Sequence, residues 1–127
     1  MVESQVQVKV SPFQGKVIRK DETEEVRGFV VEFQLNSPIE PADVAEVAHA
    51  IASAVANKVG NGDTVIVSGR GPIYLHSAIA QELRSQTCGV AIAHFDPKVN
   101  GAVVVYPHHL TGAVIQMNPE EVAKQIQ

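Results

Sequence analysis

Two short polar runs in this sequence combine residue types that bind phosphate groups. Ser68-Gly69-Arg70-Gly71 follows one apolar run, and Asp96-Pro97-Lys98 follows another. The arginine can hold a phosphate through two parallel hydrogen bonds, and the glycines allow the backbone to approach a ligand closely. Lysine and arginine are sparse after residue 28, and Arg70, Arg84 and Lys98 all fall in this region. If the protein binds an anion, these residues are the first candidates.

The elements expected around these runs bring both to one edge of a sheet. Thr64–Val67 and Gly89–Phe95 are predicted strands, and the first has the even apolarity of a strand covered on both faces. Pro72 opens a helix that reaches about Leu83. The unit is then a right-handed crossover between parallel strands, whose carboxyl ends share an edge. Open α/β sheets bind ligands in that crevice, and the helix N-terminus favours phosphate. A turn that merely links a strand to a helix would look the same.

The rest of the chain adds one helix and several strands. Alternating or β-branched residues between turn signals predict strands at residues 6–10, 28–35, 102–106 and 113–116. Lys20–Glu25 is interpreted as a charged loop. Pro41 begins a helix with an apolar stripe between Val44 and Val55, and Gly60 is its expected terminator. Asn100-Gly101 is a hairpin signal. The sequence therefore predicts an α/β fold with a mixed sheet, a central βαβ unit and about two main helices.

Four residues of metal-binding type lie close to the predicted hairpin: His94, Asp96, His108 and His109. In that hairpin His108 lies at the far end of its strand from Asp96, about 20 Å away for six residues at ~3.3 Å each. One ion cannot bind both within a monomer. The helix runs antiparallel to the strands, which puts Arg84 at the His108 edge. A site that combines the two edges would have to be built between subunits.

Composition and charge restrict the class of protein. The 127 residues fit one domain, residues 1–127, and 45% hydrophobic with 19% charged residues is typical of a globular protein. A net charge of −4 argues against binding of long nucleic acids. Cys88 is the single cysteine, which fits a reducing compartment. Without a membrane-length apolar run or a secretion signal, a cytoplasmic location is expected.

Several signatures in a fixed order resemble a known family. The run Ser68–Leu75, the motif Phe95-Asp96-Pro97-Lys98 and the strand Gly101–Val105 before His108 are similar to the Csx-three family of CRISPR-associated ring nucleases of type III systems. The resemblance covers residues 64–109. It implies a Rossmann-like fold related to the CARF domains that sense cyclic oligoadenylates. It also implies a homodimer, head-to-tail stacking into tetramers or filaments on ligand, and manganese-dependent cleavage of cyclic tetra-adenylate that ends the antiviral signal.

The resemblance assigns roles position by position, with two departures. Ser68 and Arg70 match the family's ligand loop, and Asp96 and His108 match its aspartate and histidine. The candidate ligand-binding residues are Ser68, Gly69, Arg70, Gly71 and Lys98, and the candidate catalytic residues are Asp96, His108 and Arg84, with Asp96 also a candidate manganese ligand. Lys98 replaces a family arginine, which keeps the charge but loses the paired hydrogen bonds. The family's histidine after the helix is absent, and Leu83–Gln86 stands there. Arg84 cannot accept a proton at neutral pH, although it can stabilise a phosphorane.

Three hypotheses follow from these residues. The first is a ring nuclease for cyclic tetra-adenylate. The second is a sensor or sponge that binds the messenger but turns it over weakly or not at all, and the missing histidine favours it. The third is an unrelated structural or interaction domain with a coincidental Gly-Arg-Gly-Pro turn. Arg70→Ala separates the third from the others, because it abolishes ligand binding only if the crevice is a site.

Overall fold

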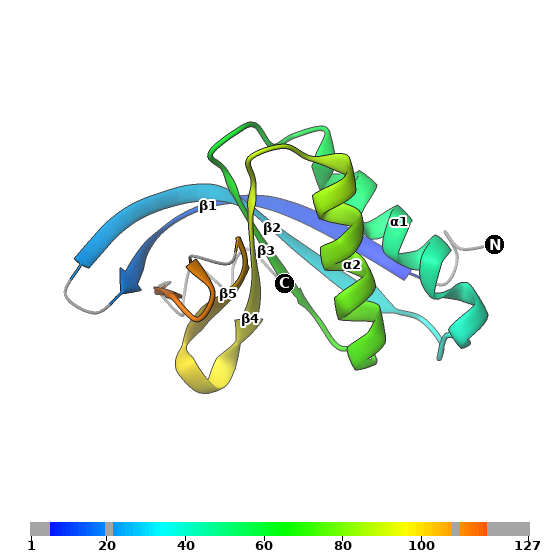
Figure 1. The fold of residues 1–127 in the computed structure, drawn as a ribbon. Helices are drawn as coiled ribbons and strands as arrows, with labels where there is room; N and C mark the ends of the chain where they lie inside the picture. The colour runs from blue at the N-terminus through cyan, green and yellow to red at the C-terminus, as the bar shows by residue number, and fades with distance from the viewer. Residues whose placement is uncertain (1–5, 20–21, 108–109, 117–127) are drawn as a thin grey trace.

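The computed structural model describes residues 6–19, 22–107 and 110–116 of the chain (Figure 1). The strands are β1 (Val6–Arg19), β2 (Glu22–Leu35), β3 (Thr64–Gly69), β4 (Ala91–Asp96), β5 (Gly101–Tyr106) and β6 (Val114–Gln116). The helices are α1 (Val44–Ala56) and α2 (Ile73–Gln86), with short 3₁₀ turns η2 (Pro41–Asp43) and η3 (Pro97–Val99). No helix among these residues is both long and apolar enough to cross a membrane.

The six strands close into a barrel in the order β1-β2-β3-β4-β5-β6, so the predicted Rossmann-like α/β fold built on a central βαβ unit is wrong. Strands β2, β3 and β4 run parallel, and the remaining pairs are antiparallel. Closure occurs where β6 pairs with β5 on one side and with Lys16–Ile18 of β1 on the other. At that seam a Cβ on Gly101 would collide with the carbonyl oxygen of Ile115, so a glycine lets the strands approach.

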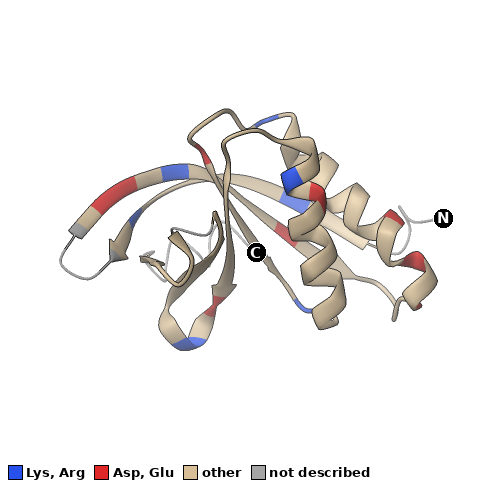
Figure 2. Cartoon of the chain, viewed as in Figure 1, with Lys and Arg blue, Asp and Glu red and all other residues tan. Residues whose placement is uncertain are grey.

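The first hairpin is longer than the sequence predicts. β1 and β2 pair over their whole length, from Val6 opposite Leu35 to Arg19 opposite Glu22. The interpretation of Lys20–Glu25 as a loop is therefore wrong for Glu22–Glu25, which belong to β2. Exposed acidic residues such as Glu24 and Glu25 are tolerated there because this end of the hairpin projects away from the helices (Figures 1 and 2). The extra length carries β1 to β6 and permits closure.

Two apolar clusters follow from the alternation of side chains along the strands. One fills the barrel and includes Phe13, Ile66 and Ile115. The other lies between the outer face of the strands and the two helices, and includes Phe33 and Val67. Because β3 contributes to both clusters, the predicted stretch Thr64–Val67 within it is buried at all four positions, as an evenly apolar strand predicts.

The two helices pack side by side on one face of the strands (Figure 1). The predicted apolar line of α2 is confirmed, since Leu75, Ile79 and Leu83 are fully buried. In the first helix Pro41 opens η2 rather than α1 itself, and the stripe that includes Val47 is buried as predicted. This packing leaves the opposite side of α2 free to form the wall of a groove.

Candidate functional site

A groove of about 930 Å³ lies between α2 and the outer face of β4 and β5. Its walls combine apolar, polar and charged side chains: Gly69, Ile73, His76, Ser77, Ala80, Gln81, Arg84, His94, Phe95, Asp96, Val103, Val105 and Tyr106. Ile73, Ser77, Ala80, Gln81 and Arg84 recur at helical spacing and so share one face of α2. The groove therefore follows the helix axis from its N-terminus to its last turn.

The groove joins two groups of predicted site residues. Gly69 and Asp96 lie at one end, because β3 and β4 are parallel neighbours and both finish at that edge. Arg84 lies eleven residues beyond the start of α2, about 16 Å along the axis at ~1.5 Å per residue. Sequence reasoning put Asp96 and Arg84 on separate edges that only a second subunit would unite, yet both line one groove of one chain. The predicted catalytic residue His108 lies outside the described residues.

The predicted ligand run Ser68–Gly71 begins with the last two residues of β3 and continues through the connection to α2. Ser68 is nearly buried, with 8% of its surface exposed, whereas Arg70 and Gly71 are exposed at the loop surface. Pro72 is the N-cap of α2, and it makes no side-chain hydrogen bond to the first turn. Basic positions lie at both ends of α2 (Figure 2). Since Arg70 has no ion pair with another described residue, its guanidinium is available to an anion.

Gly69 has a structural reason to be glycine, separate from any ligand. Its φ is +153°, and a Cβ there would lie 2.6 Å from the carbonyl oxygen of Phe33 and 2.8 Å from the Phe33 ring. Both contacts are shorter than packed atoms allow. Gly71 is less constrained, because its Cβ would meet only side-chain atoms of Leu75 and Phe33 at 3.1 and 3.2 Å. The Gly-Arg-Gly pattern is therefore partly a packing requirement of the β3–α2 connection.

Asp96 shapes the turn that carries Lys98. Its Oδ1 accepts a hydrogen bond from the backbone N–H of Lys98 at 2.9 Å, which caps η3. The chain then turns through Asn100 in the left-handed conformation, at φ 53°, and enters β5, which confirms the predicted hairpin. Lys98 is exposed, and its side chain does not line the groove. Asp96 keeps its second carboxylate oxygen for a ligand.

Arg84 is held over an aromatic ring at the far end of the groove. Its guanidinium carbon lies 4.6 Å from the centre of the Tyr106 ring, a cation–π contact. The contact holds the guanidinium beside the ring, and Arg84 is nevertheless an exposed residue. Arg84 has no ion pair with another described residue, so its hydrogen-bond donors are available to a ligand.

Two histidines form the middle of the groove, and sequence reasoning did not assign either of them to the ligand site. His76 on α2 and His94 on β4 pack edge to face with ring centres 5.3 Å apart, and His76 also lies 5.3 Å from the ring of Phe33. Burial lowers the pKa of both histidines, so the pair is neutral at pH 7. The Nδ1 atom of His94 is buried without a hydrogen-bond partner. The signal in the sequence is the spacing of His94 and Asp96, which puts both on the same face of β4.

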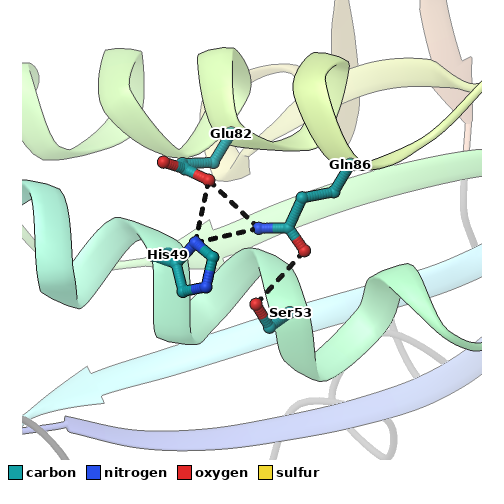
Figure 3. A network of polar contacts seen from close by, with 4 residues as sticks. All are labelled: His49, Ser53, Glu82 and Gln86. Atoms are coloured by element: carbon teal, nitrogen blue, oxygen red, sulfur yellow. Dashed lines mark hydrogen bonds and ion pairs between the residues drawn. The ribbon is translucent and has the colours of Figure 1, made fainter.

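A polar network on the far side of α2 fixes it against α1 (Figure 3). His49 Nδ1 lies 3.2 Å from Glu82 Oε2, and Gln86 Nε2 donates to the same oxygen at 3.0 Å. Ser53 Oγ donates to Gln86 Oε1 at 3.1 Å. The hydrogen bonds from Gln86 and His49 lower the pKa of Glu82. His49 is thus an exposed helix residue whose ring contacts Glu82 on the neighbouring helix.

Metal-ligating side chains are dispersed in this part of the chain. Within residues 6–19, 22–107 and 110–116, no three His, Cys, Asp or Glu side chains are close enough together to hold a metal ion. Asp96, the predicted manganese ligand, uses one oxygen to cap η3. The described residues therefore do not form a complete manganese site by themselves.

These features define the class of protein: it is a small β-barrel domain whose two helices cover one face and whose second helix borders a polar groove. The chain belongs to the family described as CRISPR-associated protein (Cas_csx3), whose family model matches residues 32–116. That match includes every described residue of the groove and confirms the resemblance to the Csx-three family.

A relative from Aquifex aeolicus (strain VF5), described as "Uncharacterized protein", is 35% identical over 79 residues. The alignment covers 62% of this chain and 66% of the relative, so the chain spans slightly less than two thirds of the relative's length. No solved structure matches this chain. The comparisons therefore establish a CRISPR-associated family and leave the reaction to be argued from the groove.

Proposed function

We propose that this protein binds cyclic tetra-adenylate in the groove beside α2 and cleaves the ring, which ends a type III CRISPR antiviral signal. Membership in the Cas_csx3 family supports a CRISPR-associated role. The observation that carries the proposal is the continuity of the groove. It connects the loop end, with Gly69 and Asp96, to the Arg84 end within one chain.

The proposed reaction uses a ribose 2′-hydroxyl of the ring as nucleophile. Its oxygen forms a bond to the adjacent phosphorus, the bond from phosphorus to the 5′ oxygen breaks, and that oxygen takes a proton. The reaction requires in-line geometry, a proton acceptor and positive charge near the phosphate oxygens. Arg70 and Lys98 are the candidates for this charge beside the Asp96 end of the groove, and Arg84 is the candidate at its other end. Asp96 is the candidate acceptor, and His108, outside the described residues, is the second.

Manganese stays in the proposal as an expectation from the family resemblance. Asp96 and His108 are the residues of this chain that would contribute ligands, and a second subunit would have to complete the set. The attack of the 2′-hydroxyl on phosphorus is written without the metal. Comparing turnover in manganese with turnover in EDTA tests the requirement directly.

A second candidate function is a sensor or sponge that binds the messenger with little turnover. The observation that favours it is Arg84 at the groove end where the family has a histidine after the helix. Arginine donates hydrogen bonds but cannot take a proton from a hydroxyl at neutral pH. Binding would then persist while the chemical step slows or stops.

A homodimer, and head-to-tail stacking of dimers on the ligand, belong to the same proposal. Large exposed apolar side chains lie near the loop end of the groove, and Ile73, with 85% of its surface exposed, is the most prominent of them. Tyr74 beside it is 48% exposed. A second copy or a ring-shaped ligand would cover these side chains and remove them from water. Sedimentation with and without cyclic tetra-adenylate tests for stacking.

The test of function is incubation with cyclic tetra-adenylate in manganese or in EDTA, resolved by chromatography and mass spectrometry. Linear products from the wild type support the ring nuclease, and tight binding of an intact ring supports the sensor. Arg70→Ala abolishes binding in either case. Arg27→Ala is the matched control, because Arg27 is exposed but lines a different cleft with Lys58. Absence of binding by the wild type refutes both functions.

A further inference from the structure

The Arg84 end of the groove combines the positive charge of its guanidinium with the chemistry of a base-binding surface. The guanidinium carbon lies 4.6 Å from the centre of the Tyr106 ring, and Arg84 is exposed. Apolar residues flank it, including Ala80 and Val105. Arginine planes and aromatic rings are the surfaces on which proteins stack unpaired bases. The other cations near the groove, Arg70 and Lys98, lie at its opposite end.

Gln81 stands beside this stacked pair. It lies three residues before Arg84, so the two side chains share a face of α2, and both line the groove. Gln81 is exposed and has no hydrogen bond to another described residue. Its amide offers one acceptor and two donors in a single plane. A planar ligand stacked on Arg84 would therefore meet an unused hydrogen-bonding edge.

We propose that the Arg84 end of the groove is an adenine subsite, in which a base stacks on Arg84 and Gln81 binds the base edge. A glutamine amide pairs with adenine through two hydrogen bonds, because it accepts from the N6 amino group and donates to N7. Hypoxanthine and guanine present two acceptors, O6 and N7, on the same edge. The glutamine carbonyl would then face O6 without a proton between them. Gln81 thus determines specificity, and Arg84 provides the stacking surface.

This inference rests on the proposed function, because it takes cyclic tetra-adenylate as the ligand. It goes beyond that function by assigning base recognition to three side chains of one protomer. The substitution Gln81→Arg gives its sharpest consequence. Arginine pairs with two acceptors on one edge, so this variant is expected to prefer hypoxanthine over adenine.

The experiment measures binding of cyclic tetra-adenylate and cyclic tetra-inosinate by calorimetry at one fixed salt concentration. The wild type is expected to prefer the adenylate ring, and Gln81→Ala is expected to reduce that preference by about 5- to 150-fold. Gln81→Arg is expected to reverse it. Gln34→Arg, at an exposed position of β2 outside the groove, controls for added charge. Tyr106→Ala is expected to weaken binding of both cyclic ligands, and Tyr106→Phe is expected to weaken binding of neither, because stacking requires only the aromatic side-chain ring.

The outcomes separate the subsite from the function. An unchanged ratio of the two affinities in Gln81→Ala and Gln81→Arg overturns the adenine subsite. If Arg70→Ala still abolishes binding in that case, the proposed function stands without it. If the wild type binds neither ring, both proposals are wrong. Thermal unfolding of each variant shows whether a lost affinity reflects a lost fold.

Discussion

Replacement of Gly69 by alanine tests whether the Gly-Arg-Gly loop is built for packing as well as for a ligand. The new Cβ would lie 2.6 Å from the Phe33 carbonyl oxygen, and the backbone would have to keep a φ of +153°. A non-glycine residue in such a region costs about 1–3 kcal/mol. Forcing extra atoms into a packed core costs about 1–3 kcal/mol more. Gly69→Ala is therefore expected to destabilise the fold by about 2–6 kcal/mol, with no ligand present.

The assay is thermal and denaturant unfolding followed by circular dichroism, because the chain has no tryptophan for fluorescence. At about 4 °C per kcal/mol for a domain of this size, the midpoint should fall by about 8–24 °C. Gly71→Ala should cost under about 1 kcal/mol, since its neighbours are the ends of side chains. Gly60→Ala should be neutral or slightly stabilising, because nothing lies within 4 Å of its Cβ. Equal stability of the three variants would refute the reasoning.

Three further predictions concern the groove and the helix pair. Asp96→Ala should lower the free energy of unfolding by about 0.5–2 kcal/mol, because it removes the cap on the Lys98 N–H. Asp96→Asn should keep the fold and lose turnover. Equal unfolding midpoints for the two variants would contradict the capping role. The pKa of Glu82 is lowered in the folded state, so its contribution to stability is present above the unfolded pKa of 4.5 and is lost as pH falls through the folded pKa. Thermal melting between pH 3 and 7 should therefore show a smaller drop in melting temperature on acidification for Glu82→Gln than for the wild type. His94→Phe removes a buried nitrogen that has no partner and keeps an aromatic ring beside His76. In urea unfolding, the free energy of unfolding should change by no more than about 1 kcal/mol. A loss above about 2 kcal/mol would mean that Nδ1 has a partner.

Much of the local structure could be predicted from spacing alone. The apolar line Leu75, Ile79 and Leu83 defined the buried side of α2, and Asn100-Gly101 marked the turn before β5. Both patterns depend on neighbours within a few residues, where propensity and periodicity act directly. The motifs around Arg70 and Asp96 also indicated the family that the comparison confirms.

The groove could be predicted only in part. Parallel pairing of β3 and β4 follows from their apolar runs and the helix between them, and it brings Gly69 and Asp96 to one edge. The position of Arg84 over Tyr106 depends on a register shift between Ile92 and Ala93 in the β4–β5 pair. Local sequence carries no clear signal for that irregularity, so the contact between Arg84 and Tyr106 could not be predicted.

The sequence by itself determined the family, the buried faces of the helices and the order of the polar motifs. Only the tertiary structure decided that the strands form a closed barrel, because closure joins Lys16 of β1 to Gln116 of β6, far apart in the chain. A pairing at that separation depends on strand length, twist and a close approach at Gly101, and none of these is a property of a short segment. The same packing decides which side of α2 stays open, and so where the groove lies.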